Sequence, residues 1–180
     1  MYDLDPMIFQ RLKKHLFQKH LQKELEIYVE LPRNLTEDPI QKIAVLVDEV
    51  QLSTPSIQMD LEEKLHVSSR DIEVLVFCPF DKKRTYLENE ITKKDFGWSG
   101  SLKLNKLKEF VKSDCDLLIN YGLEENLYWK VITLRSQSKF KIGFSSNDNR
   151  LYDLSVSDSK RNTTVLTREA EKYLKILKKI

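Results

Sequence analysis

The fold is decided by KIAVLVDE (42–49) and DIEVLVF (71–77), two short apolar runs that are rich in β-branched residues. Runs of this kind are typical of strands that are buried on both faces of a parallel sheet. Between them, the tripeptide STP (53–55) supplies an N-cap and a first-turn proline for a helix. A strand, a helix and a second strand in this order predict a βαβ unit.

The same alternation continues toward the C-terminus. Three further strands are predicted at CDLLINY (115–121), KFKIGF (139–144) and LYDLSV (151–156), and helices are predicted at 103–112, 124–135 and 167–180. Strands that alternate with helices favour a parallel sheet covered on both faces. We therefore expect an α/β fold over residues 41–180: a three-layer Rossmann-like domain with about five mainly parallel strands.

Burial on both faces gives a sharper prediction for the four central strands. Six of their side chains should be almost wholly buried: Val45, Val47, Val74, Val76, Leu118 and Ile142.

Residues 1–40 are predicted to form a basic amphipathic helix and a connector. Apolar residues recur at helical spacing over 5–26, and the helix has no acid between positions 10 and 23. Its five basic residues there are Arg11, Lys13, Lys14, Lys19 and Lys23. Three interpretations are open: the helix packs on the sheet with its lysines in water, lies on an anionic membrane surface, or contacts the phosphates of a ribonucleoprotein.

Composition places the chain among ordinary globular proteins. It has 180 residues, a length that suits one domain, and 41% of them are hydrophobic and 32% charged. The net charge is only +2, so the molecule as a whole does not attract nucleic acid strongly. No run is long enough to span a membrane and no signal peptide is recognised at the N-terminus, so we expect a cytoplasmic protein. Cys78 and Cys115 lie in or beside apolar runs and are expected to be inert buried thiols.

Motifs for cofactors, metals and covalent catalysis are absent from the sequence. The four glycines form neither GxGxxG nor a P-loop, and His15 and His20 are five residues apart rather than four. No GxSxG motif is present, and neither cysteine has a histidine near it in sequence. The sequence therefore predicts no catalytic residue, no cofactor and no metal.

A ligand site, if there is one, is expected where the parallel strands end. Ligands of open α/β sheets bind outside the carboxyl ends of the strands. The polar side chains there are Asp48, Glu49, Asp81, Asn120, Tyr121, Ser145 and Ser146. Trp98, in the turn DFGWSG (95–100), can stack on a ring ligand or plug the core, and we favour the plug because a buried tryptophan contributes much apolar area.

Several stretches together resemble a family of small bacterial proteins known as a domain of unknown function. They are KDFGWSG, CDLLINY, SKFKIGFSSNDNRLYDL and EKYLKILKKI. They are similar to that family's W-[SY]-G turn, DLLI strand, K-x-[DKR]-x-G strand and closing YLKIL helix. The resemblance spans residues 42–180 and implies no established activity.

A fainter likeness is to the N-terminal half of heptosyltransferase-type glycosyltransferases. CDLLINY, the helix to Arg135 and KFKIGF come in the same order as that family's DLxIDLQ-like strand, helix and (K/R)xIGF strand. The likeness implies a Rossmann-like fold. A second domain for a nucleotide sugar is missing, and Asn120 and Tyr121 replace the family's usual residues.

These observations favour a non-enzymatic binding or interaction module that contacts a protein, a ribonucleoprotein or an anionic membrane surface through the N-terminal helix. The alternative is a small enzyme or nucleotide-type ligand binder that uses the carboxyl edge of the sheet. A deep pocket at that edge would favour the second function, and a filled edge the first.

Overall fold

The architecture is described by a computed structural model for residues 6–32, 38–51, 57–122, 126–146 and 148–180. The side chains of residues 6–10 and of Lys13 lie outside this description, as does the predicted cap at 53–55.

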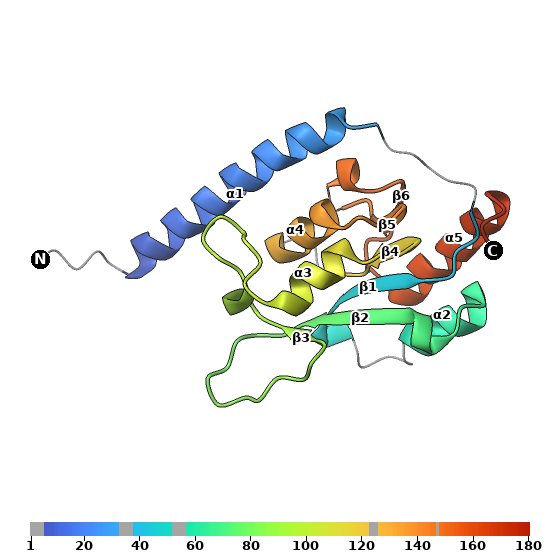
Figure 1. Ribbon diagram of the computed structural model, residues 1–180, viewed down its shortest axis with the longest axis horizontal. Helices are drawn as coiled ribbons and strands as arrows, with labels where there is room; N and C mark the ends of the chain where they lie inside the picture. Colours follow the sequence, from blue (N-terminus) through green and yellow to red (C-terminus); the bar gives the residue numbers. More distant parts are fainter. Residues whose placement is uncertain (1–5, 33–37, 52–56, 123–125, 147) are drawn as a thin grey trace, which may run out of the picture.

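A single six-stranded parallel sheet forms the centre of the molecule (Figure 1). Its strands are β1 (Ile43–Asp48), β2 (Ile72–Phe77), β3 (Glu90–Ile91), β4 (Leu117–Asn120), β5 (Phe140–Phe144) and β6 (Leu154–Val156). The strand order is β3-β2-β1-β4-β5-β6, and every pair is parallel. Strand order reverses between β1 and β4, which is the place where doubly wound folds of this order bind ligands.

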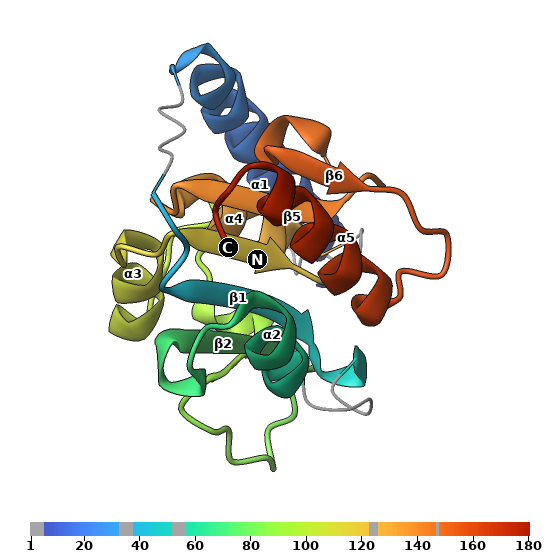
Figure 2. The same ribbon diagram turned by 90° about the vertical axis from the view of Figure 1, so that its right-hand side faces the viewer.

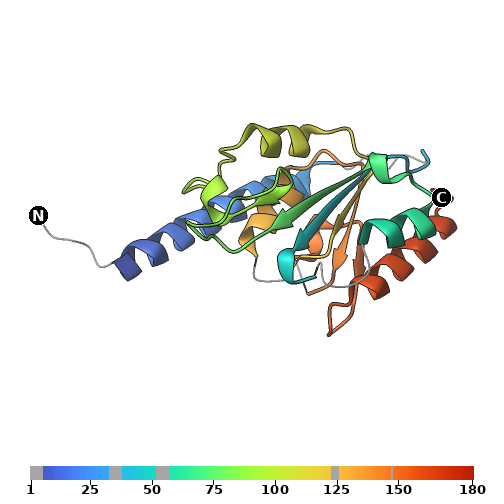
Figure 3. The ribbon, with the colours of Figure 1, turned by 90° about the horizontal axis from the view of Figure 1, so that it is seen from below.

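Helices cover both faces of the sheet and complete three layers (Figures 2 and 3). They are α1 (Pro6–Glu30), α2 (Ile57–Leu65), α3 (Asn105–Lys112), α4 (Leu127–Arg135) and α5 (Thr163–Ile176). Side chains of α2 and α5 pack with Val45 and Val47 on one face. Those of α1, α3 and α4 pack with Ala44 and Leu46 on the other, as the two-residue period of a strand requires. The predicted three-layer Rossmann-like fold is confirmed.

The predicted burial of the central strands is confirmed with one exception. Val45, Val47, Leu118 and Ile142 are fully buried and Val76 nearly so. Val74 is only partly buried. It lies in β2, and the neighbouring strand β3 pairs only with Val76 and Phe77, so nothing flanks Val74 on its outer side within the described strands.

The strand count and strand lengths differ from the prediction. The sheet has a sixth strand, β3, whose two residues carry no pattern that a sequence could reveal. The predicted strand 151–156 is shorter, because residues 149–151 form a 3-10 turn before β6.

The long helix α1 packs on the sheet's α4 side through its second half. Phe17, Leu21 and Leu25 are buried there, four residues apart. Arg135 of α4 ties the helix down, since its Nε and Nη2 donate to the two carboxylate oxygens of Glu24 at 3.0 and 2.7 Å. The N-terminal turns extend past the body of the molecule (Figure 3). Among the described helices, none is long and apolar enough to cross a membrane.

The expectation that Trp98 plugs the core is wrong. Its side chain is 45% exposed, whereas Phe96, two residues earlier, is fully buried and packs against Tyr128. The turn places the smaller ring inside. Gly100 closes it with a φ of 78°, and a Cβ there would lie 2.1 Å from the ring of Phe17, so the turn and α1 fit closely.

Candidate functional site

The end of β1 is filled by side chains from α4. Asp48 is 7% exposed, and its two oxygens accept hydrogen bonds from Asn126 Nδ2 (2.9 Å) and Trp129 Nε1 (3.1 Å). Trp129 is itself buried, and a Cβ on Gly122 would lie 2.0 Å from its ring. The indole therefore fills the space beside the switch point in which a ligand would otherwise bind.

The residues that end β4 are also committed to the interior. Asn120 Nδ2 donates to Tyr152 Oη (2.8 Å) and Thr133 Oγ1 (3.2 Å), and its Oδ1 accepts from Gly122 N (2.8 Å). Tyr121 is fully buried, and its hydroxyl is hydrogen-bonded to Thr167 Oγ1 at 2.7 Å. Burial raises the pKa of Tyr121, so it stays neutral at physiological pH. The polar atoms of these two side chains thus make hydrogen bonds within the protein.

The remaining predicted ligand-site residues do not join them. Asp81 is exposed in the 79–89 loop, where its Oδ1 accepts from Lys83 N at 2.9 Å. Ser145 is partly buried after β5, and its N–H donates to Val156 O at 2.9 Å in the sheet. Ser146 is exposed, and its Oγ accepts a hydrogen bond from Arg161 Nη1. Trp98 belongs to the turn beside α1 and Arg135. These predicted residues thus lie at the ends of several elements.

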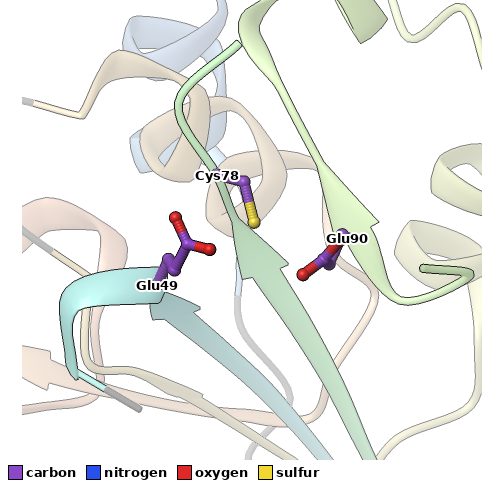
Figure 4. A group of neighbouring side chains, drawn as sticks. All are labelled: Glu49, Cys78 and Glu90. Atoms are coloured by element: carbon purple, nitrogen blue, oxygen red, sulfur yellow. The ribbon is translucent and has the colours of Figure 1, made fainter. Parts of the chain in front are cut away.

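Another group lies at the carboxyl ends of β1 and β2, beside the start of β3, and includes Glu49, which the sequence nominated. Figure 4 shows Glu49, Cys78 and Glu90 directed toward one another, and their ligand atoms lie within 4.8 Å. Arg84 inserts its guanidinium between the carboxylates: Nη1 donates to Glu49 Oε1, and Nη2 donates to Glu90 Oε1 at 2.6 Å. The positive charge that a metal ion would supply is therefore provided by arginine.

The electrostatics of this group oppose nucleophilic chemistry. Burial, with the nearby carboxylates of Glu90 and Glu49, raises the pKa of Cys78 to about 11, so the sulfur is a thiol at neutral pH. A hydrogen bond from Leu87 N and the charge of Arg84 hold the pKa of Glu90 below its usual value, although burial opposes this. We interpret the group as an ion pair that fastens the 79–89 loop to the sheet. Both cysteines are buried and unpaired, as predicted.

The predicted docking residues are exposed where their side chains are described. Arg11, Lys14, Lys19 and Lys23 are all at the surface of α1, and Lys13 lies outside the described side chains. Leu12 and Leu16, two of the apolar residues that recur at helical spacing in α1, are 49% and 44% exposed. They lie on the face of the helix opposite Phe17, Leu21 and Leu25, the side chains that are buried.

A groove of about 410 Å³ runs beside these residues, between α1 and the start of α4. Its floor is apolar, made by Leu21, Leu25, Leu127 and Leu151, and its rim carries His15, Lys19 and Lys130. Sequence reasoning missed Leu127, Lys130 and Leu151, because nothing local indicates which helix packs beside α1.

A comparison with known protein families identifies the family of this chain. The profile of a family of unknown function (DUF6913) matches residues 13–177. The chain belongs to this family. The match starts inside α1, so the family includes the packed half of this helix, whereas the resemblance seen in the sequence began at residue 42. No curated protein and no solved structure matches the chain, and the likeness to heptosyltransferase-type glycosyltransferases finds no support.

Proposed function

We propose that the protein is a non-enzymatic interaction module of the cytoplasm that binds an acidic amphipathic segment of a partner protein along α1. The observation that carries the proposal is the groove between α1 and α4, with its apolar floor and basic rim. A partner segment with leucine-like and acidic side chains would complement both parts. Recognition of an amphipathic helix in a groove uses this kind of surface.

The outward face of α1 meets the rim of the groove at Lys19. Leu12, Leu16, Lys19 and Lys23 are spaced four, three and four residues apart, so they follow one line along the helix. This line lies on the side opposite the packed residues Phe17, Leu21 and Leu25. Two exposed leucines followed by two lysines offer apolar area and positive charge to the same partner.

The charge of the groove is not cancelled from within. Asp148 is the one acid among the residues that line it, and Arg150 binds both of its oxygens at 2.8 and 2.7 Å. Hydrogen bonds from Arg150 keep the pKa of Asp148 below its usual value, though burial opposes them. Lys19 and Lys130 therefore present positive charge to an approaching acidic segment.

The described side chains at the carboxyl edge support this function over the alternative of a small enzyme or ligand binder. Asp48, Asn120 and Tyr121 use their polar atoms for hydrogen bonds within the protein. A catalytic or ligand-binding group at this edge would need a polar atom directed toward substrate.

Site-specific photocrosslinking tests the proposal in the cells that make the protein. A benzophenone amino acid replaces Leu16, and the control carries it at Ile176 on α5, which is 66% exposed. We expect a discrete crosslinked protein from position 16 that is absent from position 176. The purified partner should then bind the wild-type chain, with an affinity that falls with added salt.

Charge reversal identifies the surface that the partner uses. Lys19→Glu with Lys23→Glu should weaken binding by about tenfold or more, whereas Lys108→Glu with Lys112→Glu, an exposed pair of equal spacing on α3, should not. Co-sedimentation with phosphatidylglycerol vesicles and with poly(U) RNA tests the two other interpretations of the helix, binding to an anionic membrane surface and binding to RNA phosphates. Binding to vesicles or RNA without any crosslinked protein would overturn the proposal.

A further inference from the structure

The outer edge of β2 is open along most of its length. β3 pairs with β2 only at Val76 and Phe77, so residues 72–75 have no strand beside them on that side in the described part of the chain. Such an edge carries backbone groups that can pair with another strand.

The backbone period shows which groups are presented. Val76 N donates to Asn89 O and Cys78 N donates to Ile91 O, so even-numbered residues of this segment turn their polar groups toward β3. By the two-residue repeat of a strand, the N–H and C=O of Val74 face the same way. Val74 therefore offers one donor and one acceptor to an added strand, at a position of β2 that precedes the start of β3.

A groove of about 530 Å³ lies against this edge. β2 contributes Glu73, Val74 and Leu75, and α3 forms the opposite wall with Glu109 and Phe110. Glu88 borders one end of the groove. An extended segment laid beside β2 would fit between this edge and α3.

The rim of the groove is acidic. Glu73, Glu88 and Glu109 are exposed, and the one lysine of the lining, Lys106, is already bonded through Nζ to the carbonyl oxygens of Glu88 (2.5 Å) and Glu90 (2.8 Å). Although the residue is exposed as a whole, partial desolvation of its carboxylate raises the pKa of Glu73. A cation beside the carboxylate would offset the cost of holding it in the charged form.

We infer that the open edge of β2 binds an extended basic peptide by strand addition. Backbone pairing with Val74 supplies the hydrogen bonds, and Glu73 and Glu109 select lysine or arginine on the face toward α3. A second copy of this chain fits less well, because pairing β2 with β2 would bring two Glu73 carboxylates together. This surface is separate from the α1 groove and binds a partner of opposite charge.

The probe is the fluorescein-labelled peptide Lys-Val-Lys-Val-Lys with blocked ends, titrated against the full chain by fluorescence anisotropy. We expect saturable binding, and none for Glu-Val-Glu-Val-Glu. Glu73→Lys and Glu109→Lys should each weaken binding by about tenfold. The matched control Glu63→Lys, which changes an exposed acid on α2 by the same charge, should leave it unchanged. Glu73→Gln keeps the size of the side chain and should show an intermediate loss.

Backbone methylation separates strand addition from charge attraction alone. N-methylation of the residues that face β2 removes their donors, whereas methylation of the alternate residues spares them. We expect only one of the two methylated peptides to lose binding. Equal binding of both, no saturation at about millimolar peptide, or full binding by Glu73→Lys would each overturn the inference.

The two proposals fail separately. Lys19→Glu with Lys23→Glu should bind the basic peptide as wild type does, and Glu73→Lys should keep the acidic partner of α1. If Glu73→Val aggregates while no peptide binds the wild type, Glu73 only protects the edge from self-association, and the inference is wrong.

Discussion

At the scale of single residues, the buried polar side chains at the carboxyl edge are bonded to neighbours within the protein. Asp48 and Asn120 lie where a ligand of a doubly wound fold would be held, and each has its polar atoms satisfied by neighbours within the protein. A buried polar group with its partners in place contributes to a unique packing, and it becomes costly when one partner is removed. Asp48 and Asn120, whose position suggested a ligand site, thus stabilise the packing through hydrogen bonds within the protein.

Replacing Asp48 tests this role. In Asp48→Ala, Trp129 Nε1 and Asn126 Nδ2 lose the acceptor that each now has, and we expect the free energy of unfolding to fall by about 2–4 kcal/mol. Asp48→Asn retains one acceptor oxygen and should lose less. Urea denaturation followed by tryptophan fluorescence measures both. A stability of Asp48→Ala within about 0.5 kcal/mol of wild type would contradict the structural role.

The sequence predicted that Asp48 and Asn120 lie at the ends of strands, but it could not predict which side chains bond to them. The strand ends follow from the apolar runs, so Asp48 and Asn120 were placed correctly at the carboxyl edge. The ring that fills the edge comes from Trp129, in a helix whose apolar residues surround it on all sides. Its orientation depends on how α4 packs, and no local pattern encodes that.

At the scale of elements, five of the six strands could be predicted from their apolar runs. β1, β4 and β5 lie within the sheet and are composed almost wholly of apolar residues. β3 has two residues and is defined only by its pairing with β2. The sequence predicted the helix α1 from apolar residues at helical spacing, with packing on the sheet as one of three interpretations. Leu12 and Leu16 are exposed because they lie opposite the packed residues, and the sequence does not state which apolar line of the helix packs.

The amino ends of β1, β4 and β5 are held together by one carboxylate. Asp116 Oδ2 accepts from the N–H groups of Gln41 (2.9 Å) and Lys42 (3.0 Å), and Oδ1 accepts from Lys139 Nζ (2.8 Å). Burial alone would raise the pKa of Asp116, but these donors outweigh it and hold the pKa below its usual value. The ionised form is therefore the one that stabilises the fold.

Acid should remove this contribution. Because the pKa is lower in the folded chain than in the unfolded one, the stabilisation is present at neutral pH and is lost as the pH falls below about 4. Asp116→Asn should lower the free energy of unfolding by about 1–3 kcal/mol at pH 7, with the difference from wild type shrinking toward pH 3. Asp114→Asn, an exposed neighbour, is the control and should show little change. A difference that is constant with pH would mean that the charge of Asp116 does not matter.

At the scale of the whole molecule, α1 belongs to the core of one face and also forms the proposed docking surface. Phe17, Leu21 and Leu25 are part of the apolar cluster that includes Leu46 and Trp129. The sequence suggested a division into a helix with connector (1–40) and an α/β domain (41–180). Removing the helix at this boundary would therefore expose an apolar surface on α4. All six strands remain within residues 41–180, as does the opposite cluster with α2 and α5 except for Ile40.

Two truncated chains test how far that division holds. Removing residues 1–10 leaves the buried stripe of α1 in place, so this chain should unfold at the same urea concentration as the full protein. Removing residues 1–40 deletes four buried apolar side chains, Phe17, Leu21, Leu25 and Ile40, each contributing roughly 1.5–3 kcal/mol when buried, offset in part by the chain entropy that no longer has to be lost. Since whole domains are stable by only about 5–15 kcal/mol, the 41–180 fragment should unfold at a much lower urea concentration and bind an apolar dye. Its circular dichroism should still show an α/β protein, because the sheet keeps both its strands and its second layer of helices. A 41–180 fragment as stable as the full chain, without dye binding, would mean that α1 is an appendage that contributes nothing to the fold.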